Sequence, residues 1–245
     1  MVVEKIKKLE NNQLETFNKE YVNEERWPIV KKMIDQSFPE GNFSFLDIGG
    51  GNGIFTDKIL AHYPEAVGTL LDNAEVLLEM NKSHPRKKLI LSSAENLNDI
   101  FNNQNFDVIF FNWVLHHFVA ETYWQTRKTQ NEILMQAQSI LSAKGYISIF
   151  ENMYVGALFK NLPSHLIFNL TSNKKLAPVT KIFGANTAGC GVCFLSDSTW
   201  KQEISKTNLH IVNYEEFPKW KINILRQILL HIGSVRVGHF WLKRG

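Results

Sequence analysis

The sequence predicts an α/β fold with one mostly parallel sheet that is covered by helices on both faces. Two observations lead to this prediction. Short apolar runs alternate along much of the chain with segments whose apolar residues recur at helical spacing. Most of these runs are apolar at successive positions, which is typical of parallel strands buried on both faces. Alternating strands and helices of this kind indicate a doubly wound sheet.

The expected elements follow one another in a regular order. Five buried strands are expected at residues 43–48, 66–72, 87–93, 106–112 and 146–151. Helical patterns separate them at residues 53–62, 74–81, 95–101 and 121–141. Two final strands are expected at residues 210–217 and 235–244, with a helix between them. The sheet is therefore expected to have seven strands.

Four regions are expected along the chain. Residues 1–42 show helical spacing without strand alternation and are interpreted as an N-terminal helical lid. Residues 43–151 are the core of the sheet. Residues 152–195 break the alternation, and we interpret them as an insertion that packs as a cap over the carboxyl end of the sheet. Residues 196–245 return to the sheet as its C-terminal part.

Composition limits the classes of protein and partner. The 245 residues carry a formal net charge of +3, and the basic residues are scattered, so a nucleic-acid partner is not favoured. The N-terminus lacks the apolar core of a secretory leader, and no run approaches the ~20 apolar residues of a membrane span. We therefore expect a cytoplasmic protein without a membrane partner, as a monomer or a homodimer. Cys190 and Cys193 are interpreted as ordinary thiols because no second pair completes a zinc site.

Four glycines follow the first expected strand, in the stretch FLDIGGGNGIF (residues 45–55). Glycine accepts positive φ angles and lets a ligand approach the backbone closely, and ligands bind at the carboxyl ends of strands in open α/β sheets. The spacing is not that of a dinucleotide loop, because Ile54 stands where a third glycine is needed. No Gly-Lys-Ser/Thr follows, which excludes a Walker A loop. The pattern is instead Asp47-x-Gly49-x-Gly51-x-Gly53, which also fits a tight turn without a ligand.

The next two strand ends carry further candidate binding residues. Asp72 ends the second expected strand, where a carboxylate can accept hydrogen bonds from both hydroxyls of a ribose; it can also cap the helix that follows. The third strand is followed by small residues and a carboxylate, in the run Ser92-Ser93-Ala94-Glu95, where a purine base would lie. Together these strand ends predict a nucleoside-like ligand beside the glycine turn.

These motifs resemble those of the class I S-adenosylmethionine-dependent methyltransferases, which have a Rossmann-like fold. The resemblance rests on the runs LDIGGGNGIF, LLDNAEVL, SSAENL, FDVIFFNWVLHHF and GYISIFE, and it covers residues 43–151. It implies an antiparallel last strand and S-adenosylmethionine as cofactor, with S-adenosylhomocysteine as its product. Ser93 departs from the pattern, since many members have Asp there.

The resemblance also implies roles for individual residues in cofactor binding. Gly49 and Gly51 would line the methionine part of the cofactor, and Asp47 would help to place its amino group. Asp72 would hold the ribose, Ala94 and Glu95 would border the adenine, and Asn112 would lie by the sulfonium. The full expected cofactor-binding set is Asp47, Gly49, Gly50, Gly51, Gly53, Asp72, Asn73, Ser93, Ala94, Glu95 and Asn112. Arg26 or Tyr21 would reach the cofactor carboxylate if the first helix closes as a lid.

The candidate catalytic residues are His116, His117, Glu151 and Tyr154. The two histidines follow the fourth strand and have a side-chain pKa suited to a general base, although such histidines also serve only to order the loop. Glu151 ends the fifth strand, with Tyr154 close behind it, and is either a base, a substrate anchor or a residue that fixes the loop. No metal is expected.

The expected function is methyl transfer to the oxygen or nitrogen of a small organic molecule or short peptide. An aromatic-rich insertion over the cleft would enclose such an acceptor. Two alternatives remain open, namely an RNA methyltransferase and a protein that binds the cofactor without transferring its methyl group.

Overall fold

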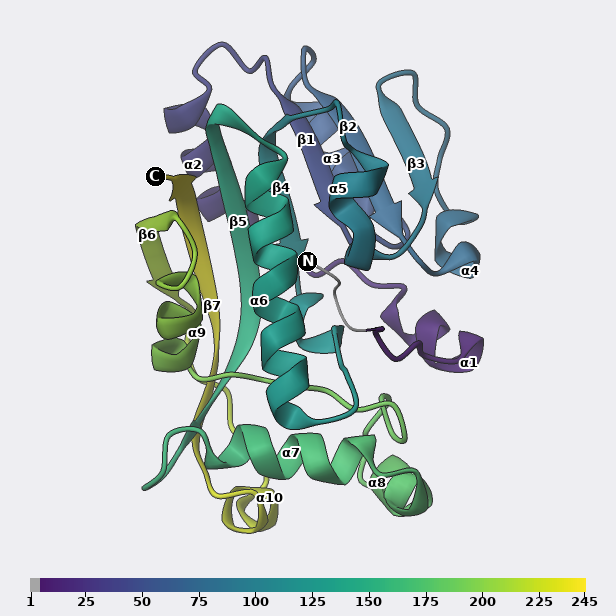
Figure 1. The fold of residues 1–245 in the computed structure, drawn as a ribbon, viewed down its shortest axis with the longest axis vertical. Coiled ribbons are helices and arrows are strands. Elements are labelled where there is room, and N and C mark those ends of the chain that lie inside the picture. The colour runs from purple at the N-terminus through teal and green to yellow at the C-terminus, as the bar shows by residue number, and fades with distance from the viewer. Residues whose placement is uncertain (1–4) are drawn as a thin grey trace.

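Seven strands form one mixed sheet in the order β3-β2-β1-β4-β5-β7-β6 (Figure 1). The computed structural model describes residues 5–245. The strands are β1 (Ser44–Ile48), β2 (Val67–Asp72), β3 (Lys87–Leu91), β4 (Phe106–Asn112), β5 (Leu141–Gly156), β6 (Leu209–Glu216) and β7 (Ile232–Arg244). The first five strands pair in parallel, and β7 is antiparallel to both of its neighbours. The predicted fold class is confirmed.

Helices alternate with the strands along the chain, as the sequence predicts. The α-helices are α1 (Asn11–Leu14), α2 (Trp27–Ser37), α3 (Ile54–His62), α4 (Glu75–Leu78), α5 (Leu97–Ile100), α6 (Tyr123–Ser139), α7 (Leu162–Ser172), α8 (Ala177–Ile182), α9 (Asp197–Ile204) and α10 (Ile224–Leu229). Short 3₁₀ turns are η1 (Glu15–Phe17), η2 (Ala94–Asn96), η3 (Leu115–His117) and η4 (Lys174–Leu176). In residues 5–245, none of the helices has the length and apolar character needed to span a bilayer.

The two faces of the sheet carry different helices. On one face α2 contributes Trp27, Val30 and Ile34 to an apolar cluster that contains Phe45 and Phe110 from the sheet. On the other face lies the long helix α6, which stands in front of the sheet in Figure 1. Within the segment predicted as a lid, α2 is therefore a core helix, because its apolar stripe is buried against the sheet.

The fifth strand is much longer than the 146–151 stretch predicted for it. It begins at Leu141 and continues to Gly156, five residues into the segment predicted as an insertion. The reason is its partner β7, whose antiparallel pairing with β5 runs from Tyr146↔Lys243 to Gly156↔Ile232. A single long partner strand supplies the hydrogen bonds that keep this segment extended.

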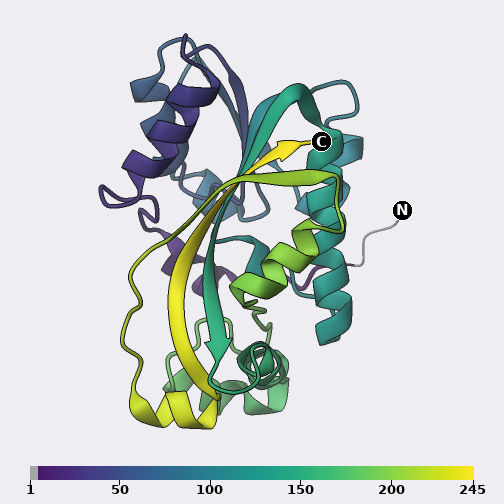
Figure 2. The same cartoon turned by 90° about the vertical axis from the view of Figure 1, so that its left-hand side faces the viewer.

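We call residues 157–196 and 217–231 the cap. It contains α7, α8 and α10, which lie together at the end of the molecule beyond the carboxyl ends of β1, β2 and β4 (Figures 1 and 2). Its first segment leaves the sheet after β5 and returns to it at α9, and its second segment connects β6 to β7.

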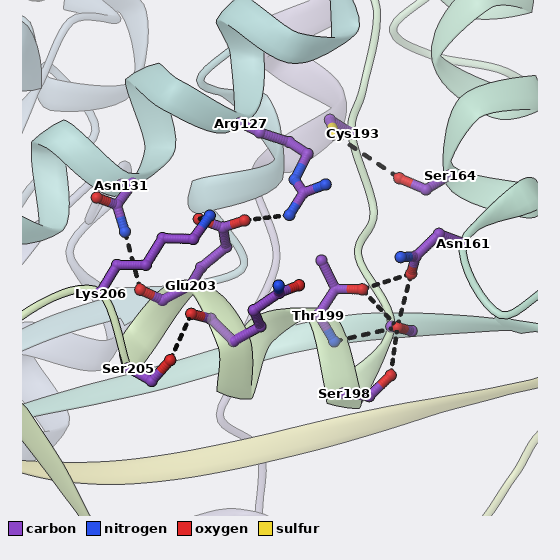
Figure 3. Close-up of polar contacts among 12 residues, drawn as sticks. Arg127, Asn131, Asn161, Ser164, Cys193, Ser198, Thr199, Glu203, Ser205 and Lys206 are labelled. Carbon is purple, nitrogen blue, oxygen red and sulfur yellow. Dashed lines mark hydrogen bonds and ion pairs between the residues drawn. The ribbon is translucent and has the colours of Figure 1, made fainter.

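Polar contacts join the two ends of the first cap segment to each other and to the core (Figure 3). The Asn161 amide oxygen accepts hydrogen bonds from the hydroxyls of Ser196 and Thr199, next to the start of α9. Helix α9 is tied in turn to α6 by an ion pair between Arg127 and the buried Glu203. These contacts hold the cap in a fixed position relative to the sheet.

Candidate functional site

The glycine-rich turn after β1 adopts backbone angles that only glycine accepts readily. Gly49, Gly51 and Gly53 have φ angles of +70°, +53° and +75°. A Cβ atom on Gly49 would lie 2.4 Å from Val114 Cγ2, and one on Gly50 would lie 2.6 Å from Asp47 Oδ2. The turn is therefore packed from behind, and its backbone faces the space beyond the strand ends.

Asp72, at the end of β2, holds this turn in place. Its Oδ2 accepts a hydrogen bond of 2.9 Å from the Gly51 backbone N–H, and its Oδ1 accepts one of 2.8 Å from Ala74. The second bond orders the entry to α4, which begins at Glu75. Burial raises the pKa of Asp72, while the backbone N–H groups lower it. One carboxylate thus joins two strand ends and faces the same space.

Asp47 lies behind the turn. It is almost fully buried, and its Oδ2 accepts a 2.8 Å hydrogen bond from the Thr56 hydroxyl. Burial raises its pKa to about 7, and the nearby charge of Asp72 adds to this shift. Asp47 does not line the cavity described below, and its expected role, to help place the amino group of the cofactor directly or through water, stays a prediction.

A cavity of about 150 Å³, which we call the glycine-loop cavity, lies beyond the strand ends. Most residues expected in the cofactor site line it, namely Gly49, Gly50, Gly51, Asp72, Asn73, Ser93, Ala94 and Asn112. Three expected residues do not line it. Asp47 lies behind the turn, Gly53 starts helix α3, and the Glu95 carboxylate accepts a hydrogen bond from the backbone of Ile6.

The N-terminal segment closes the glycine-loop cavity on its other side. Phe17, Lys19 and Tyr21 line this cavity, together with Lys7. Tyr21 was expected at the site from the sequence. Lys7 and Lys19 were not, because no local pattern in the first twenty residues marks them as facing a cavity. Arg26, the other expected contact, does not line it and instead lies over the Trp113 ring, 5.0 Å from its centroid. The first part of the predicted lid thus borders the site.

A second and larger cavity, which we call the cap cavity, adjoins the first. Its volume is about 1000 Å³, and its walls come mainly from α7, α8, α10 and the connections between them. Four residues line both cavities, namely Phe17, Tyr21, Trp113 and His117. Side chains of the cap cavity are predominantly aliphatic and aromatic, and Lys221 and Arg226 are charged residues of its wall. The two cavities therefore meet at an aromatic boundary.

A buried His–Glu pair lies at the wall of the cap cavity. His116 lines the cavity, and its Nδ1 lies 2.6 Å from Oε2 of Glu151, which is fully buried behind it. The other Glu151 oxygen accepts a hydrogen bond from the His116 backbone N–H. Burial raises the pKa of Glu151 to about 8 and lowers that of His116 to about 3, so the pair is uncharged between these values.

The remaining candidate residues surround this pair. His117 lies at the boundary of the two cavities, and its buried Nδ1 has no hydrogen-bond partner among the described residues. Tyr154 lines the cap cavity and stacks on Phe194, which in turn packs against His116. Glu151 does not reach either cavity, so any effect it has on a ligand passes through His116.

Trp113 is a functional candidate that sequence analysis did not name. It has a positive φ of 54°, which is strained for a bulky residue, and its indole N–H donates a 2.9 Å hydrogen bond to Asn152. Its ring stacks on Phe150 at a centroid distance of 5.0 Å. The packing and hydrogen bond around Trp113 hold this strained residue in place, and its side chain lines both cavities.

Comparison with known proteins identifies the class. Residues 46–149 match a family model described as a methyltransferase domain. None of the curated protein sequences matches the chain. Residues 46–149 thus match a methyltransferase domain, and the sheet has the strand order of the class I S-adenosylmethionine-dependent methyltransferase fold that the sequence motifs indicate. The glycine-loop cavity lies at the strand ends where this fold binds the cofactor.

Solved structures support the same fold. The cyclopropane synthase MmaA2 from Mycobacterium tuberculosis is 15% identical, with a TM-score of 0.58 over 93% of this chain and 88% of that one. The mycolic acid cyclopropane synthase CmaA1, complexed with SAH and CTAB, is 14% identical, with a TM-score of 0.60 over 99% and 97%. The plantazolicin methyltransferase BpumL, in complex with a triazolic desmethylPZN analog and SAH, is 14% identical, with a TM-score of 0.51 over 96% of each chain.

The residues of the glycine-loop cavity fit this cofactor. Both polar atoms of the Asn112 side chain are buried at the cavity wall, and a side-chain hydrogen bond from Asn112 opposes the rise in the pKa of Asp47, so this amide links the buried Asp47 to the cavity. The backbone turn and Asp72 offer the carbonyl, N–H and carboxylate groups that a nucleoside with a cationic amino acid requires. Lys19 offers positive charge for a carboxylate, whereas the Lys7 ammonium already lies 3.3 Å from a carboxylate oxygen of Glu121.

Proposed function

We propose that this methyltransferase methylates an oxygen or nitrogen atom of a largely apolar small organic molecule. The observation that carries the proposal is the boundary between the two cavities. Phe17, Tyr21, Trp113 and His117 line both of them, so a ligand in each would meet there. The cap cavity is several times larger than the glycine-loop cavity, and its apolar lining favours an apolar acceptor.

The chain's own residues have separate tasks in this reaction. Gly49, Gly51 and Asp72 would hold the cofactor, with Asn112 and Lys19 at its methionine end. When bound, S-adenosylmethionine supplies a methyl group that its sulfonium already activates, so alignment is the main requirement. Phe17 and Tyr21 would exclude water from the boundary. Peptide acceptors are the second class that the cavity can hold.

His116 is proposed as the base that accepts a proton from the acceptor once Glu151 is ionised, because the adjacent carboxylate then opposes the lowering of the His116 pKa by burial. Its Nδ1 is bound to Glu151, which leaves Nε2 for the acceptor in the cap cavity. When Glu151 is ionised it accepts the Nδ1–H bond, fixes the tautomer and stabilises the imidazolium that forms. Glu151 is therefore a positioning residue, and His117 and Tyr154 are proposed to orient the acceptor.

The proposal can be tested with a panel of apolar phenols, alcohols and amines. Purified protein is incubated with S-adenosylmethionine and each compound, and S-adenosylhomocysteine and methylated product are measured by mass spectrometry. We expect matched amounts of both from apolar acceptors. Leu170→Trp, which fills part of the cap cavity, should abolish transfer and leave cofactor binding intact.

The matched control is Leu158→Trp, since Leu158 is exposed and does not line either cavity. It should transfer methyl groups like the unmodified protein. Methylation of bulk RNA with no small acceptor would overturn the proposal, as would tight cofactor binding without any product.

A further inference from the structure

The cap carries positive charge and no carboxylate. Its two segments contain seven basic residues and neither Asp nor Glu. The chain has 27 basic and 24 acidic residues, so the rest of it has 20 basic and 24 acidic residues and is net negative. All seven cations are exposed, namely Lys160, Lys174, Lys175, Lys181, Lys219, Lys221 and Arg226. The small net charge of the protein therefore conceals a strongly basic cap.

The same surface is unusually apolar. Of the twenty large apolar side chains that are exposed in residues 5–245, eleven lie in the cap. Ile182 on α8 is 83% exposed and Ile228 on α10 is 71% exposed. Scattered single apolar residues are ordinary on a protein surface, whereas a concentration of them marks a site of interaction.

This apolar surface continues into the cap cavity. Six of the exposed apolar side chains also line that cavity, namely Leu170, Val179, Phe183, Trp220, Leu225 and Leu229. Helices α8 and α10 meet at this rim, where the Arg226 guanidinium donates a 2.8 Å hydrogen bond to the Phe183 carbonyl. The mouth of the cavity thus opens within the basic and apolar surface.

Three kinds of partner differ in how well they match such a surface. A second copy of this chain, joined face to face, would bring fourteen cations together without a carboxylate to pair them. Nucleic acid would match the cations but would leave side chains such as Ile182 and Ile228 without an apolar partner. An anionic lipid surface matches both features, because headgroups attract lysines while the boundary of the acyl chains accepts apolar side chains.

We propose that the cap docks on the surface of an anionic lipid membrane, with α8 and α10 at the headgroup boundary. Docked in this way, the mouth of the cap cavity faces the lipid, and the acceptor is an apolar molecule drawn from it; this second statement rests on the proposed function. The proposal departs from the sequence-based expectation of no membrane partner, which rested on the lack of an apolar run long enough to span a bilayer and took no account of binding at a membrane surface.

Vesicle sedimentation tests the docking without any acceptor. Vesicles of phosphatidylcholine alone are compared with vesicles of phosphatidylcholine and phosphatidylglycerol in equal amounts. We expect binding to the anionic vesicles only, weakened by added salt. Each basic residue near an anionic surface contributes about fivefold to binding, so Lys175→Glu with Lys181→Glu should weaken it more than about tenfold. Ile182→Asp with Ile228→Asp removes two exposed apolar side chains and adds two negative charges, so it should also weaken binding.

Matched substitutions outside the cap serve as controls. Lys144→Glu on β5 and Val212→Asp on β6 change an exposed lysine and an exposed valine and should bind vesicles like the unmodified protein. Cofactor affinity of every variant shows that it has folded, and it also separates failure of docking from failure of the proposed function.

Three results would overturn the docking proposal. The first is equal or absent binding to both kinds of vesicle. The second is a dimer in solution that Ile182→Asp with Ile228→Asp dissociates, which would assign the surface to a second copy. The third is binding of single-stranded RNA that depends on Lys175 and Lys181 but not on the two isoleucines.

Discussion

The glycine-loop cavity and the cap cavity are built in different ways. The first is formed mainly by the ends of adjacent parallel strands, and its key groups are backbone atoms of Gly49–Gly51 and the carboxylate of Asp72. The second is formed by side chains of the cap, which come from two segments far apart in the sequence. The sheet thus determines the cavity expected to hold the methyl donor. The cavity expected to hold the methyl acceptor depends instead on the cap segments, which lie outside the sheet.

Electrostatics separate the two cavities as well. The glycine-loop cavity is the more polar of the two, and its lining includes a carboxylate, amide side chains and two lysines. The cap cavity is apolar, and its titratable pair is neutral because burial opposes the charge on both His116 and Glu151. Binding is therefore expected to dominate in the first cavity and proton transfer in the second.

Glu151→Gln should reduce kcat about a hundredfold or more, the typical loss when a general base is disabled. In the unmodified protein Glu151 has a pKa raised to about 8 by burial, so it holds its proton below that pH. As the pH rises through about 8, Glu151 ionises and accepts the Nδ1–H bond, and His116 Nε2 becomes free to take a proton. Activity should therefore rise with pH through about 8.

The pH profile of methyl transfer separates this role from a structural one. Glu151→Gln lacks the titrating carboxylate, so the rise near pH 8 should disappear from its profile, while cofactor affinity stays unchanged. If the pH profile of Glu151→Gln has the same shape as that of the unmodified protein and only a lower rate, the His116–Glu151 pair only stabilises the loop. Proton transfer would then not be assigned to the cap cavity.

Gly49→Ala should weaken cofactor binding about a hundredfold. The φ of +70° strains a side-chain-bearing residue by about 1–3 kcal/mol, and the added Cβ would lie 2.4 Å from Val114 Cγ2. The turn must therefore move, and its backbone leaves the position that faces the cavity. Calorimetric titration with S-adenosylmethionine measures the change.

Gly41→Ala is the matched control for the strain. Gly41 has a similar φ of +66° but lies before β1, outside both cavities, and its Cβ would lie 3.3 Å from Tyr63. It should lower thermal stability with little change in cofactor affinity. If both variants bind the cofactor equally well, the backbone of the turn does not contact it.

Asp72→Asn should weaken cofactor binding about tenfold. The amide keeps one oxygen, so it can accept a hydrogen bond from either Gly51 or Ala74, and the second N–H loses its partner at a cost of about 1–3 kcal/mol. Asp72→Ala removes both acceptors and should bind more weakly still. Calorimetric titration with S-adenosylmethionine measures the affinity of both variants and of the unmodified protein. Equal affinity in all three would show that Asp72 does not contribute to cofactor binding.

The difference between the cavities explains how much the sequence revealed. Asp72 and Ala94 were expected because each lies at or just after a strand end, and strand ends can be read from local apolar runs, whereas Asn112 was implied only by the family resemblance. The parallel sheet then brings these ends to one edge. Local patterns were thus sufficient for most of the glycine-loop cavity and for the fold.

The cap could not be derived in the same way. Its charge and apolar side chains are visible in the sequence, but the meeting of α8 with α10 depends on the return of β7 along β5, which carries residues past 230 back to residue 156. The predicted end of the fifth strand at residue 151 was wrong for the same reason. Trp113 could not be predicted as a site residue from the sequence, because a positive φ angle and the contacts of its ring with Phe150 and Arg26 are visible only in the structure.

Lys19→Met should weaken cofactor binding only about threefold to tenfold. It compares the contribution of the N-terminal segment to cofactor binding with that of the strand ends. Lys19 lines the glycine-loop cavity from the N-terminal segment rather than from a strand end, and it is exposed, so solvent and salt screen its charge. Added salt should therefore reduce the difference between the variant and the unmodified protein. Lys8→Met, an exposed lysine that lines neither cavity, is the control. A loss as large as that of Gly49→Ala would mean that the N-terminal segment, and not the sheet alone, fixes the donor.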